Sequence, residues 1–306
     1  MGRLAEHVRT SAAQIARSAQ SVQIDVARLG AYDPDPGDGG APVVSDPGLD
    51  PVRHYLEGAP GDVALYTLAL DPINFGSGWF PTLTKRTDPA TGRTVSGYFT
   101  VAWNLADAFR VEGPWAVSDL REMTTARLAG VLGQRADHEL MSLYTQALRE
   151  LGRFLGDRSA LDLIASAGGS ADRLAATLAG GMAFYDDRGF FKRAQIVPND
   201  LALAGVAEFG DLDELTIFAD NLVPHVLRCD GLLVYSPELA ARIDAEQRLP
   251  AGREEREIRA CAVHACELLS ARLGVPARVL DMWLWNRGQS PEIKARPRHR
   301  CRTVYY

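Results

Sequence analysis

Apolar residues recur at every third or fourth position along most of this chain, and this spacing constrains the fold more than any other feature. The pattern runs through residues 101–178 and returns in residues 253–273 and 277–285. It is typical of amphipathic helices, whereas the alternation with a period of two that marks half-buried strands is scarce. We therefore predict a mainly α fold with few short strands.

The apolar stripes and their end signals outline individual helices. One helix is predicted over residues 4–29, and Ser118, Thr125 and Gly274 are candidate helix ends, the first two as N-caps and the glycine as a stop. Residues 63–70 form an apolar run that fits either a strand or a buried helical turn. The clearest predicted core stripes are Leu140, Leu143, Tyr144, Ala147, Leu148, Leu151 and Leu155 in one helix, and Ile258, Cys261, Ala265, Leu268 and Leu269 in another.

Composition is that of an ordinary water-soluble globular protein. The 306 residues are 46% hydrophobic and 24% charged, and the formal net charge of −6 is the wrong sign for a protein that follows a phosphate backbone. No apolar run is long enough to span a membrane, and the four cysteines include no C-x-x-C pair. We expect a cytoplasmic monomer with one domain over residues 1–306, in which two helical lobes around an active-site cleft are one possible arrangement.

The sequence carries no recognisable metal or cofactor motif. Residues 33–51 are rich in Asp, Pro and Gly, but the prolines and the lack of a closing glutamate favour a solvated loop over a calcium site. Neither an H-E-x-x-H zinc motif nor a phosphate-binding P-loop is found. We therefore expect no metal and no cofactor.

An acidic residue opens a short apolar helix in residues 218–227, which read Phe-Ala-Asp-Asn-Leu-Val-Pro-His-Val-Leu. The simplest role for Asp220 is that of an N-cap, which accepts hydrogen bonds from backbone amides. Together with the glycine-containing unit at 203–210, the segment resembles the helix-hairpin-helix base-excision glycosylases. That resemblance implies a glycosylase-like helical fold. It also places Asp220 at the catalytic aspartate, which stabilises the cationic sugar and helps to activate water.

The sequence departs from the DNA-repair members of that superfamily in three respects. Ala207 replaces the second glycine of the G-x-G whose amides hold a DNA phosphate, no cysteine quartet for an iron–sulfur cluster follows, and the net charge is negative. These departures count against DNA as the substrate, but they leave the bond-breaking chemistry intact.

Several short segments, in the same order and over a similar length, closely resemble the queuosine salvage family. They are Asp-Pro-Ile-Asn-Phe-Gly-Ser-Gly-Trp-Phe-Pro at 71–81, Phe-Lys-Arg-Ala-Gln-Ile at 191–196, Phe-Ala-Asp-Asn at 218–221 and the stretch from 281 to 306. The resemblance implies an N-glycosylase that releases the base queuine from queuosine 5′-monophosphate, so that the base can be salvaged for tRNA modification.

Queuine is a 7-deazaguanine, so protonation at N7 cannot help the base to leave. Catalysis must then depend on stabilising the sugar cation, the role expected of Asp220, and on contacts to the leaving base. Phe75 and Trp79 could stack on the base while Asn74 or Asp71 contacts its edge. The alternative that these aromatic rings are core residues is about as strong.

Charged residues elsewhere complete the predicted site. Either Asp186 or Asp187 is expected to contact the amine or diol of queuine, since adjacent residues of an extended segment face opposite ways. Lys192 and Arg193 are predicted to bind the 5′-phosphate rather than to form a buried ion pair. Further candidates for the phosphate and ribose are His225, Arg298 and Arg300, although a structural role is the simpler expectation for the histidine. The aromatic end of the chain, Val-Tyr-Tyr, predicts that this basic tail docks on the protein.

Two other functions remain open on sequence alone. A glycosylase that flips a base out of a nucleic-acid polymer would need a basic face and would show strong salt dependence. A non-catalytic protein that only binds a deazaguanine base or nucleotide would need the aromatic and polar groups but no carboxylate facing the sugar. The expected partners are therefore the nucleotide substrate and queuine, with neither a nucleic-acid polymer nor a membrane.

Overall fold

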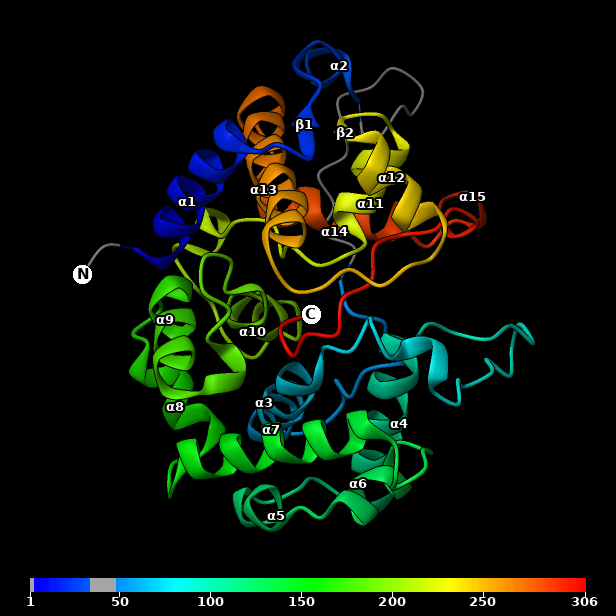
Figure 1. The fold of residues 1–306 in the computed structure, drawn as a ribbon. Coiled ribbons are helices and arrows are strands. Elements are labelled where there is room, and N and C mark those ends of the chain that lie inside the picture. Colours follow the sequence, from blue (N-terminus) through cyan, green and yellow to red (C-terminus); the bar gives the residue numbers. More distant parts are fainter. Residues whose placement is uncertain (1–2, 34–47) are drawn as a thin grey trace. The chain divides into compact units, whose positions relative to one another are not determined.

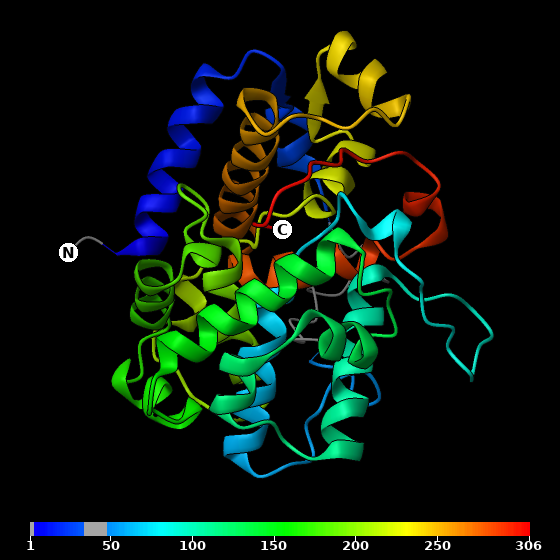
Figure 2. The same cartoon turned by 60° about the horizontal axis from the view of Figure 1, so that its bottom comes forward.

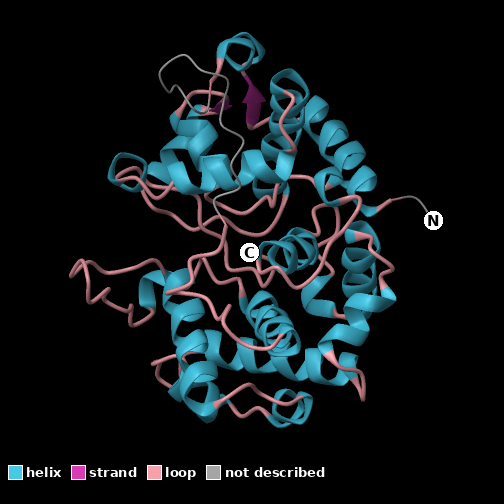
Figure 3. Cartoon of the chain, turned by 180° about the vertical axis from the view of Figure 1, so that it is seen from behind, coloured by secondary structure: helices cyan, strands magenta, loops and turns pink. Residues whose placement is uncertain are grey.

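The computed structural model describes residues 3–33 and 48–306, and helices supply nearly all of the regular structure in that part of the chain (Figure 1, Figure 3). The mainly α prediction is confirmed. The chain divides into two compact units. The first unit takes its described residues from 3–33, 188–192 and 211–302, and the second takes them from 48–187, 193–210 and 303–306. Residues 34–47 of the predicted 33–51 loop lie outside the described residues.

The long helix α13 is the centre of the first unit. Helix α1 packs along it, and α11 and α14 contact it as well (Figure 1). Strands β1 and β2 form a two-stranded antiparallel sheet in which Val22 lies opposite Tyr235. The elements of this unit are α1 (Leu4–Ser18), β1 (Val22–Ile24), α2 (Val26–Ala31), the 3₁₀ turn η4 (Leu212–Glu214), α11 (Val223–Cys229), β2 (Leu233–Tyr235), α12 (Pro237–Asp244), α13 (Arg253–Leu273), α14 (Ala277–Arg287) and α15 (Pro291–Lys294).

Helix α7 organises the second unit, where it contacts α3, α5, α6 and the 3₁₀ turn η1 (Figure 2). Its inner face is the predicted stripe, except that Leu143 is only half-buried. The elements are α3 (Pro60–Leu70), η1 (Asp71–Ile73), η2 (Phe80–Thr82), α4 (Gly97–Glu112), α5 (Val117–Glu122), α6 (Thr125–Val131), α7 (Glu139–Leu155), α8 (Ala160–Ser166), α9 (Ala171–Gly181), η3 (Ala183–Tyr185) and α10 (Lys192–Leu203), whose first residue is counted with the first unit.

The predicted single helix over residues 4–29 is wrong. Helix α1 ends at Ser18, and Val22–Ile24 pairs with β2 instead. Asp25 then caps the separate helix α2 by accepting a hydrogen bond from the amide of Arg28 at 2.9 Å. The valines of this stretch recur at helical spacing, but pairing with a strand more than 200 residues away outweighs that local signal.

Other helix ends agree with the sequence to within a residue or two. Helix α13 has the predicted bounds, and Gly274 ends it with a left-handed φ of 68°. Ser118 and Thr125 lie inside α5 and α6 rather than capping them. The N-cap residue of α5 is Ala116, and that of α6 is Thr124, whose side chain accepts from the amide of Arg127. The ambiguous run at 63–70 is helical. Leu268, predicted as core, is 38% exposed.

A buried end of the chain confirms that the tail docks. The carbonyl of Tyr306 accepts a hydrogen bond from the amide of Gly76 at 3.1 Å, and the tyrosine is 3% exposed. Both residues belong to the second unit. No helix in the described part of the chain combines the length and apolar character needed to cross a membrane.

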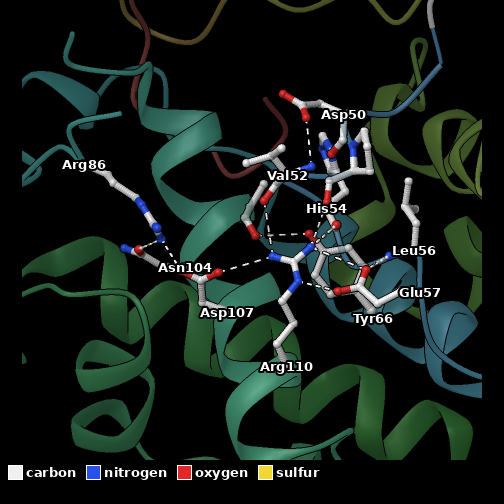
Figure 4. Close-up of polar contacts among 12 residues, drawn as sticks. Asp50, Val52, His54, Leu56, Glu57, Tyr66, Arg86, Asn104, Asp107 and Arg110 are labelled. Carbon is white, nitrogen blue, oxygen red and sulfur yellow. Dashed lines mark hydrogen bonds and ion pairs between the residues drawn. The ribbon is translucent and has the colours of Figure 1, made fainter. Parts of the chain in front are cut away.

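Arg110 of α4 fixes the turn that opens the second unit, as Figure 4 shows. Its guanidinium donates to the carbonyls of Val52 at 3.2 Å and His54 at 2.7 Å, and it also pairs with Glu57 and with Asp107. His54 is thereby held with its Nε2 3.0 Å from the hydroxyl of the half-buried Tyr98 side chain. One arginine therefore satisfies several carbonyls that a turn would otherwise expose.

Candidate active site

Asp220 lies three residues before the first residue of α11, and Leu222 rather than the predicted Asp220 is the N-cap residue of that helix. Its Oδ1 accepts hydrogen bonds from the amides of Leu222 at 2.6 Å and Val223 at 3.0 Å. Among the described residues, Oδ2 has no hydrogen-bond partner, and the residue is half-buried. The carboxylate therefore holds the backbone at the start of α11, and it uses only one of its two oxygens to do so. The second oxygen is available to a ligand.

The backbone on both sides of Asp220 is anchored within the first unit. The amide of Phe218 donates to Asp281 Oδ1 at 2.8 Å, and the carbonyl of Ala219 accepts from Arg259 Nε at 2.9 Å. On the other side, Asn221 Nδ2 donates to the carbonyl of His299 at 3.0 Å. The carboxylate is thus held by its neighbours as well as by its own cap.

The first unit also contains most of the cations predicted to bind phosphate and ribose. Arg298 is half-buried, and burial lowers the pKa of its guanidinium from the usual range, an effect that the charge of Asp220 opposes. Lys192 is 5% exposed and follows Phe191, whose φ of 48° is unusual for a residue with a side chain. Arg300 has its guanidinium 3.9 Å from Glu246.

His225 has the geometry of a structural histidine. Its side chain is 3% exposed, and Nε2 lies 3.0 Å from the carbonyl of Ile293, to which it donates. Burial lowers the pKa of His225 to about 4, against the opposing effect of that hydrogen bond, so the ring is neutral near pH 7. A neutral ring offers no charge to a phosphate, and this geometry favours the structural alternative.

The predicted base-binding residues at 71–81 belong to the second unit. Phe75 is 1% exposed and packs edge-on against Tyr144 at 4.9 Å, while Trp79 is 4% exposed and donates from Nε1 to Glu139 at 2.8 Å. Asp71 is fully buried, and Asn74 is half-buried. The packing of both rings favours the core alternative, and stacking on a base stays a prediction that this geometry does not support.

Arg193 is buried in the second unit, where its guanidinium joins three separate segments. It donates to the carbonyls of Pro72, Phe184 and Val304 and lies 4.8 Å from the Phe75 ring. Burial lowers the pKa of Arg193, an effect that the nearby Asp187 and Asp71 oppose. These contacts show a clamp on backbone carbonyls, and the predicted contact with phosphate has no support in them. Asp187 is buried and Asp186 half-buried.

Comparison with known proteins decides the family. The model of the queuosine salvage protein family matches residues 54–306. The chain belongs to this family. A Sphaerobacter thermophilus protein named queuosine 5′-phosphate N-glycosylase/hydrolase is 34% identical over 285 residues, which cover 86% of this chain and 87% of the relative. Proteins of the same name are 27% identical over 282 residues in Nematostella vectensis (79% and 81% covered) and 30% identical over 197 residues in Mus musculus (55% and 58% covered).

Every predicted site residue falls inside the stretch that matches the queuosine salvage family. The first unit contains Asp220, His225, Arg298, Arg300 and Lys192, whereas the second contains Asp71, Asn74, Phe75, Trp79, Asp186, Asp187 and Arg193. Within the described residues, no group of three or more His, Cys, Asp or Glu side chains is arranged to hold a metal ion.

Sequence reasoning missed three residues that the structure places beside these groups. Tyr185 is 1% exposed, its hydroxyl has no hydrogen-bond partner in the described part of the chain, and Asp71 contributes to the raised pKa of the phenol. It lies six residues before the segment at 191–196 that resembles the family. Asp281 is the first residue of the last segment that resembles the family, so a signal for it existed. Arg259 gave no signal, because it is one of several arginines on α13.

Proposed function

We propose that this protein hydrolyses the N-glycosidic bond of queuosine 5′-monophosphate and releases queuine. Membership of the queuosine salvage family over residues 54–306 is the observation that carries this proposal. Relatives that match most of this chain bear the name queuosine 5′-phosphate N-glycosylase/hydrolase. In the reaction the bond between the sugar C1′ and the base nitrogen breaks, water adds to C1′, and the base leaves with a proton.

Asp220 is the residue that we assign to the reacting sugar. As the glycosidic bond lengthens, positive charge develops on the ribose, and a fixed carboxylate stabilises it more than it stabilises the ground state. The amides of Leu222 and Val223 hold one oxygen in place, so the orientation is set before the substrate arrives. The other oxygen is then available to face the sugar and the attacking water.

The cations of the first unit supply the expected contacts with the 5′-phosphate. We favour Arg298, because it lies within electrostatic range of Asp220, together with Lys192 and Arg300. Charge-assisted hydrogen bonds to a remote phosphate can be used to place the ribose against the carboxylate. For the base, Asp71, Asn74, Asp186 and Asp187 stay the proposed polar contacts.

The helix-hairpin-helix relationship and metal independence belong to the same proposal. Gly205 has a left-handed φ of 70° just after α10, and Asp220 precedes α11, which is the chain order of a hairpin followed by a catalytic aspartate. The donor set assigned to the reaction consists of one carboxylate and several arginine and lysine side chains, which suits direct charge stabilisation without a metal.

Release of free queuine by the purified full chain tests the function. Queuosine 5′-monophosphate, queuosine and queuosine-containing tRNA are incubated separately with the protein, and the base is measured by liquid chromatography with mass spectrometry. We expect the monophosphate to have the highest kcat/KM and tRNA to yield no base. Release from tRNA with steep salt dependence would indicate a polymer glycosylase, and tight binding of queuine without turnover would indicate a carrier.

A further inference from the structure

Arg259 contacts both the segment at 218–221, which resembles the family, and Phe190, the residue just before the segment at 191–196. Arg259, Ala219 and Phe190 all belong to the first unit. Its Nε donates to the carbonyl of Ala219 at 2.9 Å, and its guanidinium carbon lies 4.0 Å from the centre of the Phe190 ring. The side chain is 3% exposed, and Nη1 lies 3.4 Å from Glu255 one turn earlier on α13. A buried guanidinium with an acid, a carbonyl and an aromatic face around it has a single orientation.

The contact with Ala219 matters because the peptide that follows this carbonyl belongs to Asp220. Asp281 holds the amide of Phe218 on one side, and Asn221 is tied to the carbonyl of His299 on the other. Without Arg259, the carbonyl of Ala219 would lose a buried partner and the peptide could rotate. Such a rotation would turn the Asp220 carboxylate even where its cap on α11 survived.

The chemistry of arginine suits this position. A guanidinium can donate along its edge to a carbonyl while its flat face packs on an aromatic ring, and a lysine ammonium cannot do both at a fixed angle. Phe190 is 2% exposed and also packs 5.5 Å from the guanidinium of Arg256, so the ring itself has little freedom.

We propose that Arg259 is a positioning residue for catalysis, which orients Asp220 through the carbonyl of Ala219 and is itself held by Phe190. This inference rests on the proposed function of Asp220. Arg259 is not assigned any contact with substrate. Its loss should therefore lower kcat and leave KM nearly unchanged.

The main test compares kcat and KM for queuosine 5′-monophosphate in the wild type, Arg259→Lys and Asp220→Asn proteins. For Arg259→Lys we expect kcat to fall by about 10- to 100-fold, the range typical of a misplaced catalytic group, with KM changed by less than about threefold. The double variant should be no slower than Asp220→Asn alone, because Arg259 acts only through that carboxylate. A normal kcat, or losses that multiply in the double variant, would overturn the proposal.

Arg228→Lys is the matched control. Arg228 also belongs to the first unit, packs 5.0 Å from an aromatic ring (Tyr235) and pairs with an acid, Asp244, at 2.8 Å. In the described part of the chain its side chain makes no hydrogen bond or ion pair with segment 218–221, and its substitution should leave kcat within about twofold of the wild type. An equal loss of kcat in this control would show a general effect of losing a packed arginine, and would overturn the proposal.

Phe190→Leu provides a second variant in case Arg259→Lys does not fold. It keeps an apolar side chain but removes the face on which the guanidinium rests, and kcat should fall by about three- to thirtyfold while the melting transition stays cooperative. An unchanged kcat would again overturn the inference. The proposed function fails separately, when the wild type releases no queuine. Normal turnover of Asp220→Asn would instead overturn the role assigned to Asp220, and this inference with it.

Discussion

Asp220 has backbone contacts that its sequence context predicts, and a catalytic role is proposed for it in addition. Its Oδ1 accepts hydrogen bonds from the backbone amides at the start of α11, and we propose that its Oδ2 faces the sugar. Sequence could predict the capping role, because a carboxylate two or three residues before a helix accepts hydrogen bonds from local amides. The anchors provided by Arg259, Asp281 and His299 come from residues 40 to 78 positions away, and no local pattern reveals them.

Asp220→Asn separates the two roles. The amide keeps an oxygen for capping but loses the negative charge. We therefore expect the free energy of unfolding to fall by at most about 1 kcal/mol, while kcat falls by at least about 10²–10³-fold. Binding of queuosine 5′-monophosphate should survive, since no negative side chain then opposes the phosphate. The measurements are queuine release, calorimetric binding and thermal unfolding.

Asp25→Asn is the control for that substitution. Asp25 caps α2 in the same unit by accepting from the amide of Arg28, and no catalytic role is assigned to it. A similar loss of stability with ordinary turnover is expected. If Asp220→Asn behaved in the same way, Asp220 would be a structural cap and Asp186 or Asp187 would become the candidate carboxylate.

At the scale of elements, prediction from the sequence is correct where local signals determine the structure of a segment. Helices α13 and α11 were located because their apolar stripes and end residues are local signals. Strand β1 was missed, because its partner β2 lies far along the chain. The roles of Phe75 and Trp79 could not be settled for a similar reason, since an aromatic ring beside glycines suits a ligand wall and a packed core equally well.

Arg193→Lys tests whether the arginine clamps backbone carbonyls or binds the 5′-phosphate. Lysine cannot reach the three carbonyls of Pro72, Phe184 and Val304 together, so we expect a loss of stability of about 1–3 kcal/mol for each carbonyl left without a partner. The ratio of kcat/KM for queuosine 5′-monophosphate to that for queuosine should stay the same, because the clamp role involves no phosphate. Lys192→Ala is the comparison, and it should lower that ratio if the lysine binds the phosphate.

A selective loss of the preference for the monophosphate in Arg193→Lys, without a change in unfolding, would contradict the clamp. It would instead confirm the sequence-based prediction that Arg193 binds the anion. Denaturant unfolding and the two kinetic constants decide between these results.

For the whole molecule, buried histidines make stability depend on pH. Burial lowers the pKa of His225 to about 4 and that of His299 to about 3, both in the first unit, and it lowers the pKa of His54 in the second. In the unfolded chain these rings bind protons from about pH 6.5 downward, whereas the folded protein resists protonation. The contribution of these histidines to stability is therefore fully present above about pH 6.5, and it is lost as the pH decreases below that value.

The slope of this loss is predictable. Each fully buried neutral histidine lowers the free energy of unfolding by about 1.4 kcal/mol for each pH unit below its unfolded pKa, until the folded pKa is reached. Urea unfolding at pH 7.5, 6.0 and 5.0 should show the decline, and His225→Gln should reduce its slope between about pH 6 and 4, because glutamine does not titrate. His7→Gln, at an exposed position, should leave the slope unchanged. A wild-type stability that was constant from pH 7.5 to 5.0 would mean that these histidines bind protons equally well in the folded protein.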